Sequence, residues 1–324
     1  MTNPRALYEL LLDHCSTTAK IDEVLIGLVW TFCRNSDHRL GLAMSPAVPT
    51  RTLPWSGNLG GKSVTDLAAW IYAWEPYQAS IAMAAINSCI NSRTLPLNSI
   101  PIECNPDYPN LAVFDYFLPH LLGKKVVVIG RYPGLERYRE QLQLTVLEQQ
   151  PTGEDLPAAA SEFVLGDADW VFITASSIPN KTFPRLAELS AHAKTVLMGP
   201  TVPWLPQLHE LGIDYLAGVE IIDPEQLTQT IAQGGGVRIF NQGLRYRVAE
   251  LTPLNSMAWL KQQIADCAAE KYRLTVAMND WYAENNRQRF PEFNLLEQSN
   301  IRLSHLDSSY KQLWDQHGQA SPTP

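Results

Sequence analysis

The chain has 324 residues, 45% hydrophobic and 18% charged, which is enough apolar sequence to bury a sizeable core and favours two domains over one. A net charge of −8 argues against a nucleic-acid binder, because neutralising phosphates requires a basic face. No apolar run reaches the ~18–20 residues of a membrane-spanning helix and no signal-peptide pattern opens the chain, so we expect a cytoplasmic protein with neither nucleic-acid nor membrane partners.

The first 95 residues predict a small α+β domain. Apolar positions recur at helical or strand spacing, and a stretch rich in Pro and Gly separates the two kinds of element. The predicted elements are a helix over 3–15, a hairpin of strands 24–30 and 39–44 around Asn35-Ser-Asp37, a loop over 45–62, and helices over 65–74 and 76–92.

Residues 96–110 read as a linker, because prolines and asparagines are concentrated there. Strands and helices then alternate through 111–250, which predicts an α/β domain with a parallel sheet wrapped by helices on both faces. The predicted helices are 111–122, 135–142, 157–165, 183–191, 205–211 and 224–233, the strands are 126–129, 144–148, 170–174, 195–198 and 214–217, and a hairpin over 237–248 closes the domain.

Residues 251–324 predict a helical extension, with one or two amphipathic helices over 254–289. The rest of the chain, through 299–314, is more polar and is expected to end in a disordered tail. Such an appendage packs on the body of the protein or on a partner subunit. A homo-oligomer is therefore one of the partner arrangements that we expect.

The strand that ends at Gly130 is the first candidate for a ligand site. Gly130 and Gly134 lie in a strand-to-helix turn, and Glu148 follows the next strand, where many dinucleotide-binding units hold a ribose. The fingerprint G-x-G-x-x-G is incomplete, however, because only two glycines are present. A tight turn in any doubly wound sheet is the favoured interpretation, and a dinucleotide site is the alternative.

The loops that follow the predicted strands carry hydroxyls, an amide, an arginine and exposed glycine backbone. Because ligands of doubly wound sheets bind beyond the carboxyl ends of the strands, these groups predict a donor-rich pocket for an anionic or carbonyl-bearing ligand. The alternative is that they only form turns and helix caps, as Asn180 or Thr182 would. The candidate residues are Gly130, Arg131, Tyr132, Glu148, Thr174, Ser176, Asn180, Thr182, Gly199, Thr201 and Gly218.

No metal site or catalytic nucleophile is indicated. The five cysteines never occur at C-x-x-C spacing, the seven histidines show no ligand spacing, and no G-x-S-x-G turn is present. One loose group near the linker is better explained by chance proximity than by a preformed site; it comprises Glu103, Cys104, Asp107, Asp115 and His120.

Motifs spread over roughly residues 5–250 resemble those of one two-domain family. They are Gly41-Leu-Ala43, the loop Gly57 to Gly61, the helix with Asn87 and Ser88, Val128-Ile-Gly130-Arg-Tyr-Pro133, Leu147-Glu148, Thr174 with Asn180 and Thr182, Gly199-Pro-Thr-x-Pro203 and Ala217-Gly218. Ala82 and Ser88 depart from the family pattern, which usually has glycine and alanine there. The family is the one described as "putative heavy-metal chelation", with a Rossmann-like second domain and a first domain similar to the N-terminal domain of enolases.

The resemblance implies a cleft between the two domains, in which Asn87 and the loop from Gly57 to Gly61 face Gly130, Thr174 and Gly199. It leaves the cofactor open between a metal ion, a metal chelate and a nucleotide. Our first hypothesis is a protein that binds a small anionic molecule or a metal complex. The second is an enzyme with a nucleotide-type cofactor, using Glu148 and Arg131. The third is an interaction protein that uses its C-terminal helices.

Overall fold

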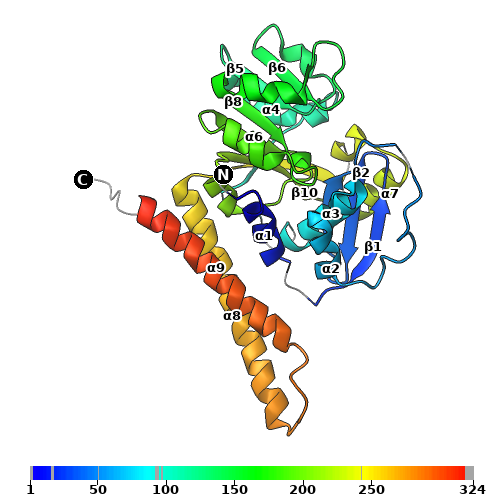
Figure 1. The fold of residues 1–324 in the computed structure, drawn as a ribbon, viewed down its shortest axis with the longest axis vertical. Coiled ribbons are helices and arrows are strands. Elements are labelled where there is room, and N and C mark those ends of the chain that lie inside the picture. Colours follow the sequence, from blue (N-terminus) through cyan, green and yellow to red (C-terminus); the bar gives the residue numbers. More distant parts are fainter. Residues whose placement is uncertain are drawn as a thin grey trace.

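The computed structural model describes residues 3–15, 18–49, 51–91, 95, 98–241 and 243–317. Its N-terminal part is an antiparallel sheet in the order β1-β2-β3 with helices beside it (Figure 1). The predicted α+β architecture is therefore confirmed, whereas the likeness to enolases stays a prediction. The elements are α1 (Ala6–Asp13), β1 (Ile21–Ile26), β2 (Trp30–Asn35), β3 (Leu40–Met44), α2 (Val64–Ala68), the 3₁₀ helix η1 (Ala69–Tyr72) and α3 (Pro76–Ile90).

The prediction of a two-stranded hairpin here was wrong, because the first predicted strand is interrupted. The chain turns after Ile26, and Trp30–Asn35 forms a strand of its own. Leu28 and Val29 lie at this turn and contact the glycine segment 234–236 of the other domain. An apolar turn that is stabilised by a distant segment leaves no local signal in the sequence.

The small sheet is covered on both faces, and one cover comes from the larger domain. Cys33 and Ala43 pack in the same cluster as α3, whereas their neighbours Phe32 and Leu42 pack in the cluster that contains Ile231 of α7 (Pro224–Ala232). Successive residues of a strand point to opposite faces. The three-stranded sheet therefore lies between α3 and α7 (Figure 1).

The larger sheet has eight strands in the order β4-β11-β10-β9-β8-β5-β6-β7. Its strands are β4 (Ile100–Pro101), β5 (Lys125–Ile129), β6 (Gln143–Glu148), β7 (Leu156–Pro157), β8 (Trp170–Thr174), β9 (Lys194–Met198), β10 (Tyr215–Ile221) and β11 (Leu244–Glu250). Neighbours from β7 to β10 are parallel, and β11 and β4 are antiparallel. Numbered from β5, the parallel strands run 3-2-1-4-5-6, which is the order of dinucleotide-binding domains.

Helices and 3₁₀ turns cover both faces of this sheet. Val126 and Val128 pack in one cluster with α4, and Val127 between them packs in the other, so the prediction of a doubly wound, Rossmann-like domain is confirmed. The covering elements are η2 (Pro109–Leu111), α4 (Ala112–Leu121), η3 (Leu135–Tyr138), η4 (Ala158–Ala160), α5 (Ser161–Val164), η5 (Leu165–Asp167), η6 (Ala175–Ser177), α6 (Phe183–Leu189), η7 (Pro206–Leu211), α7 and η8 (Val237–Phe240).

Three local predictions in this domain were wrong. The helices predicted over 135–142 and 205–211 are the 3₁₀ helices η3 and η7. The hairpin predicted over 237–248 does not form, because β11 pairs with β10 instead and residues 237–240 form η8. Its turn residue Gln242 lies outside the described residues, as do positions 96 and 97 of the predicted linker.

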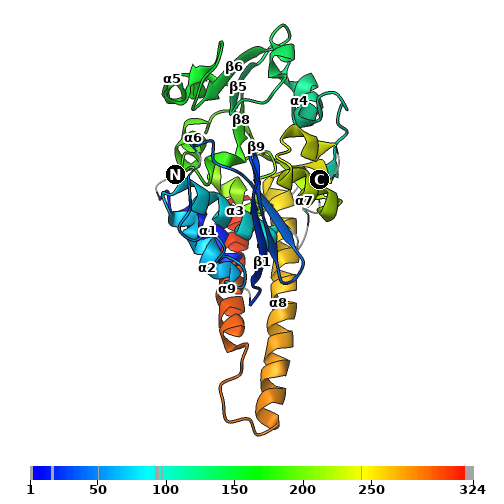
Figure 2. The ribbon, with the colours of Figure 1, turned by 90° about the vertical axis from the view of Figure 1, so that its right-hand side faces the viewer.

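Beyond the sheet, α8 (Pro253–Ala283) and α9 (Phe293–His317) form an antiparallel hairpin that projects from the body (Figures 1 and 2). The predicted helical extension is thus confirmed, and the predicted disordered tail falls on residues 318–324, which are not described. None of the helices described is both long and apolar enough to span a bilayer.

Buried clusters do not follow the predicted domain boundary. One cluster joins Ala43 and Leu67 from the N-terminal part to Leu197 of β9 and to Trp204 in the loop that follows β9. The division into 1–95, 96–110 and 111–250 stays a prediction about the chain, and the two parts share a core.

Candidate functional site

The two domains meet where the end of α3 lies against the loop after β9. Asn87, fully buried in α3, donates from Nδ2 to Leu42 O at 2.8 Å and to Thr201 O at 3.0 Å. The Thr201 hydroxyl accepts from the Met44 N–H at 2.9 Å. The predicted site residues Asn87 and Thr201 are therefore in contact, and their polar atoms hold β3 against the larger sheet.

Asn91, one turn further along α3, extends this junction. Its side chain donates to Val202 O at 2.9 Å and accepts from the Trp204 N–H at 3.0 Å. The Trp204 ring in turn covers Gly218, where a Cβ atom would lie 2.7 Å from the indole. Gly218 was expected beyond the end of a strand, but β10 continues to Ile221. The structure thus places Gly218 as a packing position inside the sheet.

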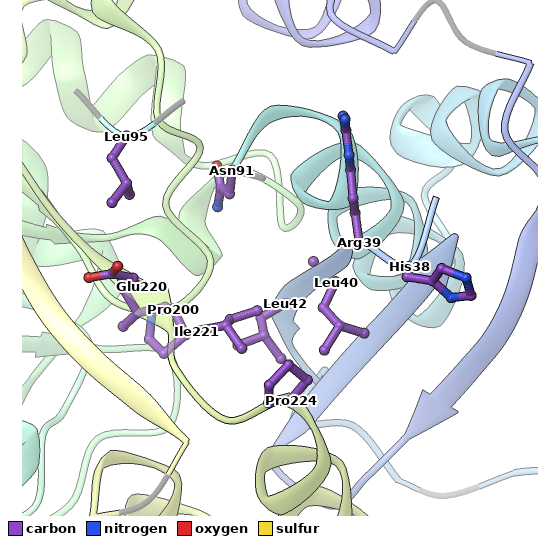
Figure 3. Close-up of a pocket in the computed structure, with 12 residues that line it drawn as sticks. His38, Arg39, Leu40, Leu42, Asn91, Leu95, Pro200, Glu220, Ile221 and Pro224 are labelled. Atoms are coloured by element: carbon purple, nitrogen blue, oxygen red, sulfur yellow. The ribbon is translucent and has the colours of Figure 1, made fainter. Parts of the chain in front are cut away.

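A pocket of about 300 Å³ opens beside this junction, with walls from both domains (Figure 3). Its apolar surface comes from Leu40 and Leu42 of β3, from Val219 and Ile221 of β10, and from Pro224. The volume is at the lower end of the roughly 300–1,000 Å³ that small-molecule sites occupy. The pocket is therefore suited to a small ligand with an apolar part.

Two charged side chains flank the pocket from opposite domains (Figure 3). Arg39 comes from the turn before β3, and within the described parts of the chain its guanidinium has no ion pair and no side-chain hydrogen bond. Glu220 accepts from Arg245 at 2.6 Å and from Arg247 at 3.1 Å. Burial would raise the pKa of Glu220, but these arginines hold it below its ordinary value. Arg39 is thus the cation that is left for an anionic ligand.

A second polar group lies at the carboxyl edge of the sheet, at the switch point between β5 and β8. A Cβ atom on Gly130 would lie 3.0 Å from Thr174, and the Thr174 hydroxyl is 3.0 Å from that of Ser176. Tyr132 lies close enough to Thr174 for that residue to affect its pKa, and its hydroxyl would lie 3.8 Å from a Cβ atom on Gly199. Five of the predicted site residues are therefore neighbours.

Two neutral phenols strengthen the donor character of this edge. Burial raises the pKa of Tyr132 to about 12, with the nearby Glu148 adding to the effect and Thr174 opposing it. Burial also holds the pKa of Tyr246, in β11, well above its ordinary value, and the hydroxyl of Tyr246 has no hydrogen-bond partner among the described residues. Both groups are protonated at neutral pH and keep an O–H to donate.

Arg131 and Glu148 hold their own loops in place. The Glu148 carboxylate accepts from the backbone N–H of Arg131 and of Gln149, both at 2.8 Å. The Arg131 guanidinium binds both oxygens of Asp155, at 2.7 and 2.8 Å. Burial would raise the pKa of Asp155, but the hydrogen bonds from Arg131 and Thr152 outweigh it and lower the pKa. The Glu148 carboxylate and the Arg131 guanidinium are therefore already engaged, although a bound nucleotide would need the carboxylate for its ribose and the guanidinium for a phosphate.

A segment of the N-terminal domain passes over the switch point. The Met44 N–H donates to the hydroxyl of Thr201, a residue that follows β9. The Ala47 carbonyl accepts at 3.3 Å from the side-chain amide of Gln150, a residue that follows β6. The ends of β8 and β5 lie between these two points in the sheet order. The switch point is therefore covered by residues 44–47, whereas the pocket beside Arg39 is open.

The remaining predicted residues are placed elsewhere. Asn180 Oδ1 accepts from the backbone N–H and from the hydroxyl of Thr182, which is the local turn role that is the alternative to ligand binding. The loop with Gly57 is attached to β1, since the Gly61 N–H donates to Ile21 O at 2.8 Å. β1 is the outer strand, and Ile21 pairs near the end of the sheet opposite to Met44. The loop with Gly57 is thus attached at β1, and its place opposite Gly130, Thr174 and Gly199 in the predicted cleft stays a prediction.

Four residues of these two sites were not predicted: Arg39, Asn91, Glu220 and Tyr246. Asn91 could have been found, because it follows Asn87 by four residues on one face of a helix. Glu220 and Tyr246 could be recognised as site residues only once β10 was known to pair with β11. Arg39 gave no signal of its own, since a charged residue beside a turn is ordinary surface.

The described residues do not bring metal-binding side chains together. They contain no group of three or more His, Cys, Asp or Glu side chains able to hold a metal ion. Cys104, from the loose group near the linker, is an exposed free cysteine. The donor set of the described chain therefore does not fit a heavy-metal ion that is bound by protein side chains alone.

These features define an α/β protein in which a Rossmann-like domain and a small α+β domain share a core and a ligand-sized pocket. Residues 112–250 match the DUF364 family model and residues 8–90 match the DUF4213 model, both described as "Putative heavy-metal chelation". The chain belongs to this two-domain family. Both matches end before α8, so the helical hairpin lies outside them.

Two solved structures share the fold. A protein of unknown function from the DUF364 family of Desulfitobacterium hafniense is 28% identical, with a TM-score of 0.67, over 77% of this chain and 100% of that one. A DUF364 protein of unknown function from Pyrococcus horikoshii is 18% identical, with a TM-score of 0.61, over 76% of this chain and 99% of that one. A search of curated proteins found no significant match.

Proposed function

We propose that this protein binds a small anionic molecule, or a metal ion already held in a small chelate, in the pocket between its two domains. The observation that carries the proposal is the guanidinium of Arg39, which has no ion-pair partner among the described residues and stands at a pocket with an apolar floor. A carboxylate or phosphate would pair with Arg39, while the rest of the ligand covers Leu40, Leu42 and Ile221.

In this proposal the metal is part of the ligand, and the chelating molecule supplies its donor atoms. The family description supports a heavy metal as cargo, whereas the described side chains offer no set of ligands for a bare ion. Metal chelates are commonly anionic because carboxylate and hydroxyl oxygens bind the metal. One guanidinium and an apolar floor recognise such a complex without touching the metal.

Native mass spectrometry tests this proposal on the protein as purified and after incubation with a small-molecule extract of cells. Ile221→Trp fills the pocket from a half-buried position of β10. Ile222→Trp is the matched control, because Ile222 is 57% exposed and does not line the pocket. We expect a non-covalent mass increment on the wild-type protein and on Ile222→Trp, and its loss from Ile221→Trp.

Two results would contradict the proposal. The first is an increment that Ile221→Trp retains, since the ligand would then lie elsewhere. The second is the absence of any increment from the wild-type protein under both conditions. The size of the increment distinguishes a metal chelate from a small organic anion.

An enzyme with a nucleotide-type cofactor is the second candidate, favoured by the strand order of the larger sheet. Against it stand the cover over the switch point and the backbone hydrogen bonds that Glu148 accepts. Titration with NAD and with ATP, followed by tryptophan fluorescence, tests this alternative. Saturable binding that Glu148→Ala weakens and Ile221→Trp leaves intact would favour it over the first proposal.

A further inference from the structure

α8 carries two apolar stripes, and only one of them is covered. Met257, Leu260 and Cys267 are buried against Leu306 and Leu313 of α9, and Leu274 continues this stripe toward the tip of the hairpin. The second stripe is exposed along its whole length and recurs at alternating spacings of three and four residues, the heptad pattern of a coiled-coil seam. It comprises Ala258, Gln262, Ala265, Ala269, Tyr272, Val276, Asn279 and Ala283.

Large apolar side chains stand at the centre of the exposed stripe. Tyr272 is 73% exposed and Val276 is 40% exposed, on a helix of 31 residues that projects into solvent (Figures 1 and 2). A helix that has no partner gains nothing from large apolar side chains at heptad positions. The exposure of Tyr272 and Val276 therefore favours association with another helix. The stripe is therefore a helix-packing surface without a partner within the described chain.

The stripe is complementary to itself when it is read in the opposite direction. About a two-fold axis between Glu270 and Lys271, Tyr272 of one chain faces Ala269 of the other, and Val276 faces Ala265. Each large side chain thus meets a small one, which lets the helices interdigitate. In a parallel pair each residue would instead meet its own copy, Tyr272 against Tyr272, and the small residues would leave gaps.

The polar positions fit the same register. Gln262 faces Asn279, an amide pair at the outer layers that fixes the alignment of the helices. Beside the seam, Asp266 of one chain comes next to Arg273 of the other, and the axis repeats this opposite-charge pair on its far side. Arg273 already binds Glu270 of its own helix and is 55% exposed, so a further carboxylate can reach it.

We propose that two copies of this chain associate through the exposed stripe of α8, antiparallel about this axis. The interface is isologous, as two-fold dimers require, because residue 269 contacts residue 272 and residue 272 contacts residue 269. The two bodies lie at opposite ends of a helix pair about 46 Å long. The association is independent of ligand binding in the inter-domain pocket.

Sedimentation equilibrium of the full-length protein tests the association. We expect a two-chain mass for the wild type and a one-chain mass for Tyr272→Glu, which buries a carboxylate against Ala269 of the partner. Trp74→Glu is the control, since Trp74 is 85% exposed in the N-terminal part. Unchanged circular dichroism verifies folding. A wild-type monomer at the highest concentration tested, or a dimer that survives Tyr272→Glu, would overturn the proposal.

Cysteine cross-linking tests the orientation. Ala269→Cys and Tyr272→Cys are made separately in a Cys104→Ser background, because Cys104 is the exposed native thiol among the described residues. The antiparallel register predicts that neither variant forms a covalent dimer alone and that an oxidised mixture of the two does. Cross-linking of each variant with itself would indicate a parallel pair and contradict the proposed axis.

Discussion

At position 41, the absence of a side chain allows α3 to lie directly on β3. A Cβ atom on Gly41 would be 2.1 Å from both Ala84 O and Ser88 N, which are backbone atoms of α3 and cannot move aside singly. This close approach also brings Asn87 within reach of Leu42 and Thr201. The domain junction therefore depends on this glycine.

Gly41→Ala should lower the free energy of unfolding by about 3 kcal/mol, because α3 must separate from β3 to admit the methyl group. Urea denaturation followed by circular dichroism measures the change. Gly60→Ala is the control, since the nearest atom there is 3.8 Å away and the position is exposed. Equal stability of the two variants would show that the contact of α3 with β3 is looser than described.

The ion pair between Arg131 and Asp155 predicts a pH-dependent contribution to stability. The folded-state pKa of Asp155 lies below its unfolded value, so the contribution is present above the unfolded pKa and lost as the pH falls through the folded one. Asp155→Asn should therefore be less stable than wild type by about 2 kcal/mol at pH 7, with the difference shrinking below about pH 4. Urea titrations across pH measure it, with exposed Asp167→Asn as control. A difference that is constant with pH would contradict the assignment.

At the scale of elements, α8 is anchored to the body at one end and free at the other. Trp259 is 1% exposed and packs in the cluster shared by the two domains, whereas Trp314 of α9 is 49% exposed. Trp259→Ala should cost about 4 kcal/mol of stability and Trp314→Ala under about 1 kcal/mol, as measured by thermal unfolding. Similar costs would mean that the hairpin does not share the core of the body.

Elements defined by local pattern were predictable, and those defined by a distant partner were not. The apolar run from Val126 to Ile129 indicated a buried parallel strand by itself. β2 was missed because an apolar turn at Leu28 determines where it begins, and β11 was given the wrong partner because its pairing with β10 is not local. The site followed the same rule: Gly130, Thr174 and Ser176 lie at the ends of strands and came together, whereas Arg39 and Glu220 flank one pocket from different domains, and no local pattern records that arrangement.

At the scale of the whole molecule, the shared core couples the two domains. Leu67 and Ala43 lie in the same buried cluster as Leu197 and Trp204, and the small sheet has α7 of the larger domain as one of its covers. Differential scanning calorimetry should therefore show that the two domains unfold together in one cooperative transition. Two separate transitions would show that the junction is weaker than its packing indicates.

The central claim is that a small ligand binds between the domains beside Arg39. A crystal structure of the protein as purified, soaked in the small-molecule extract that gives the mass increment, tests it most directly. We predict ligand density in the pocket, with an oxygen of the ligand bound to the Arg39 guanidinium and its apolar part on Leu42 and Ile221. Density at the switch point between Gly130 and Thr174 instead, with the pocket filled only by solvent, would contradict the claim.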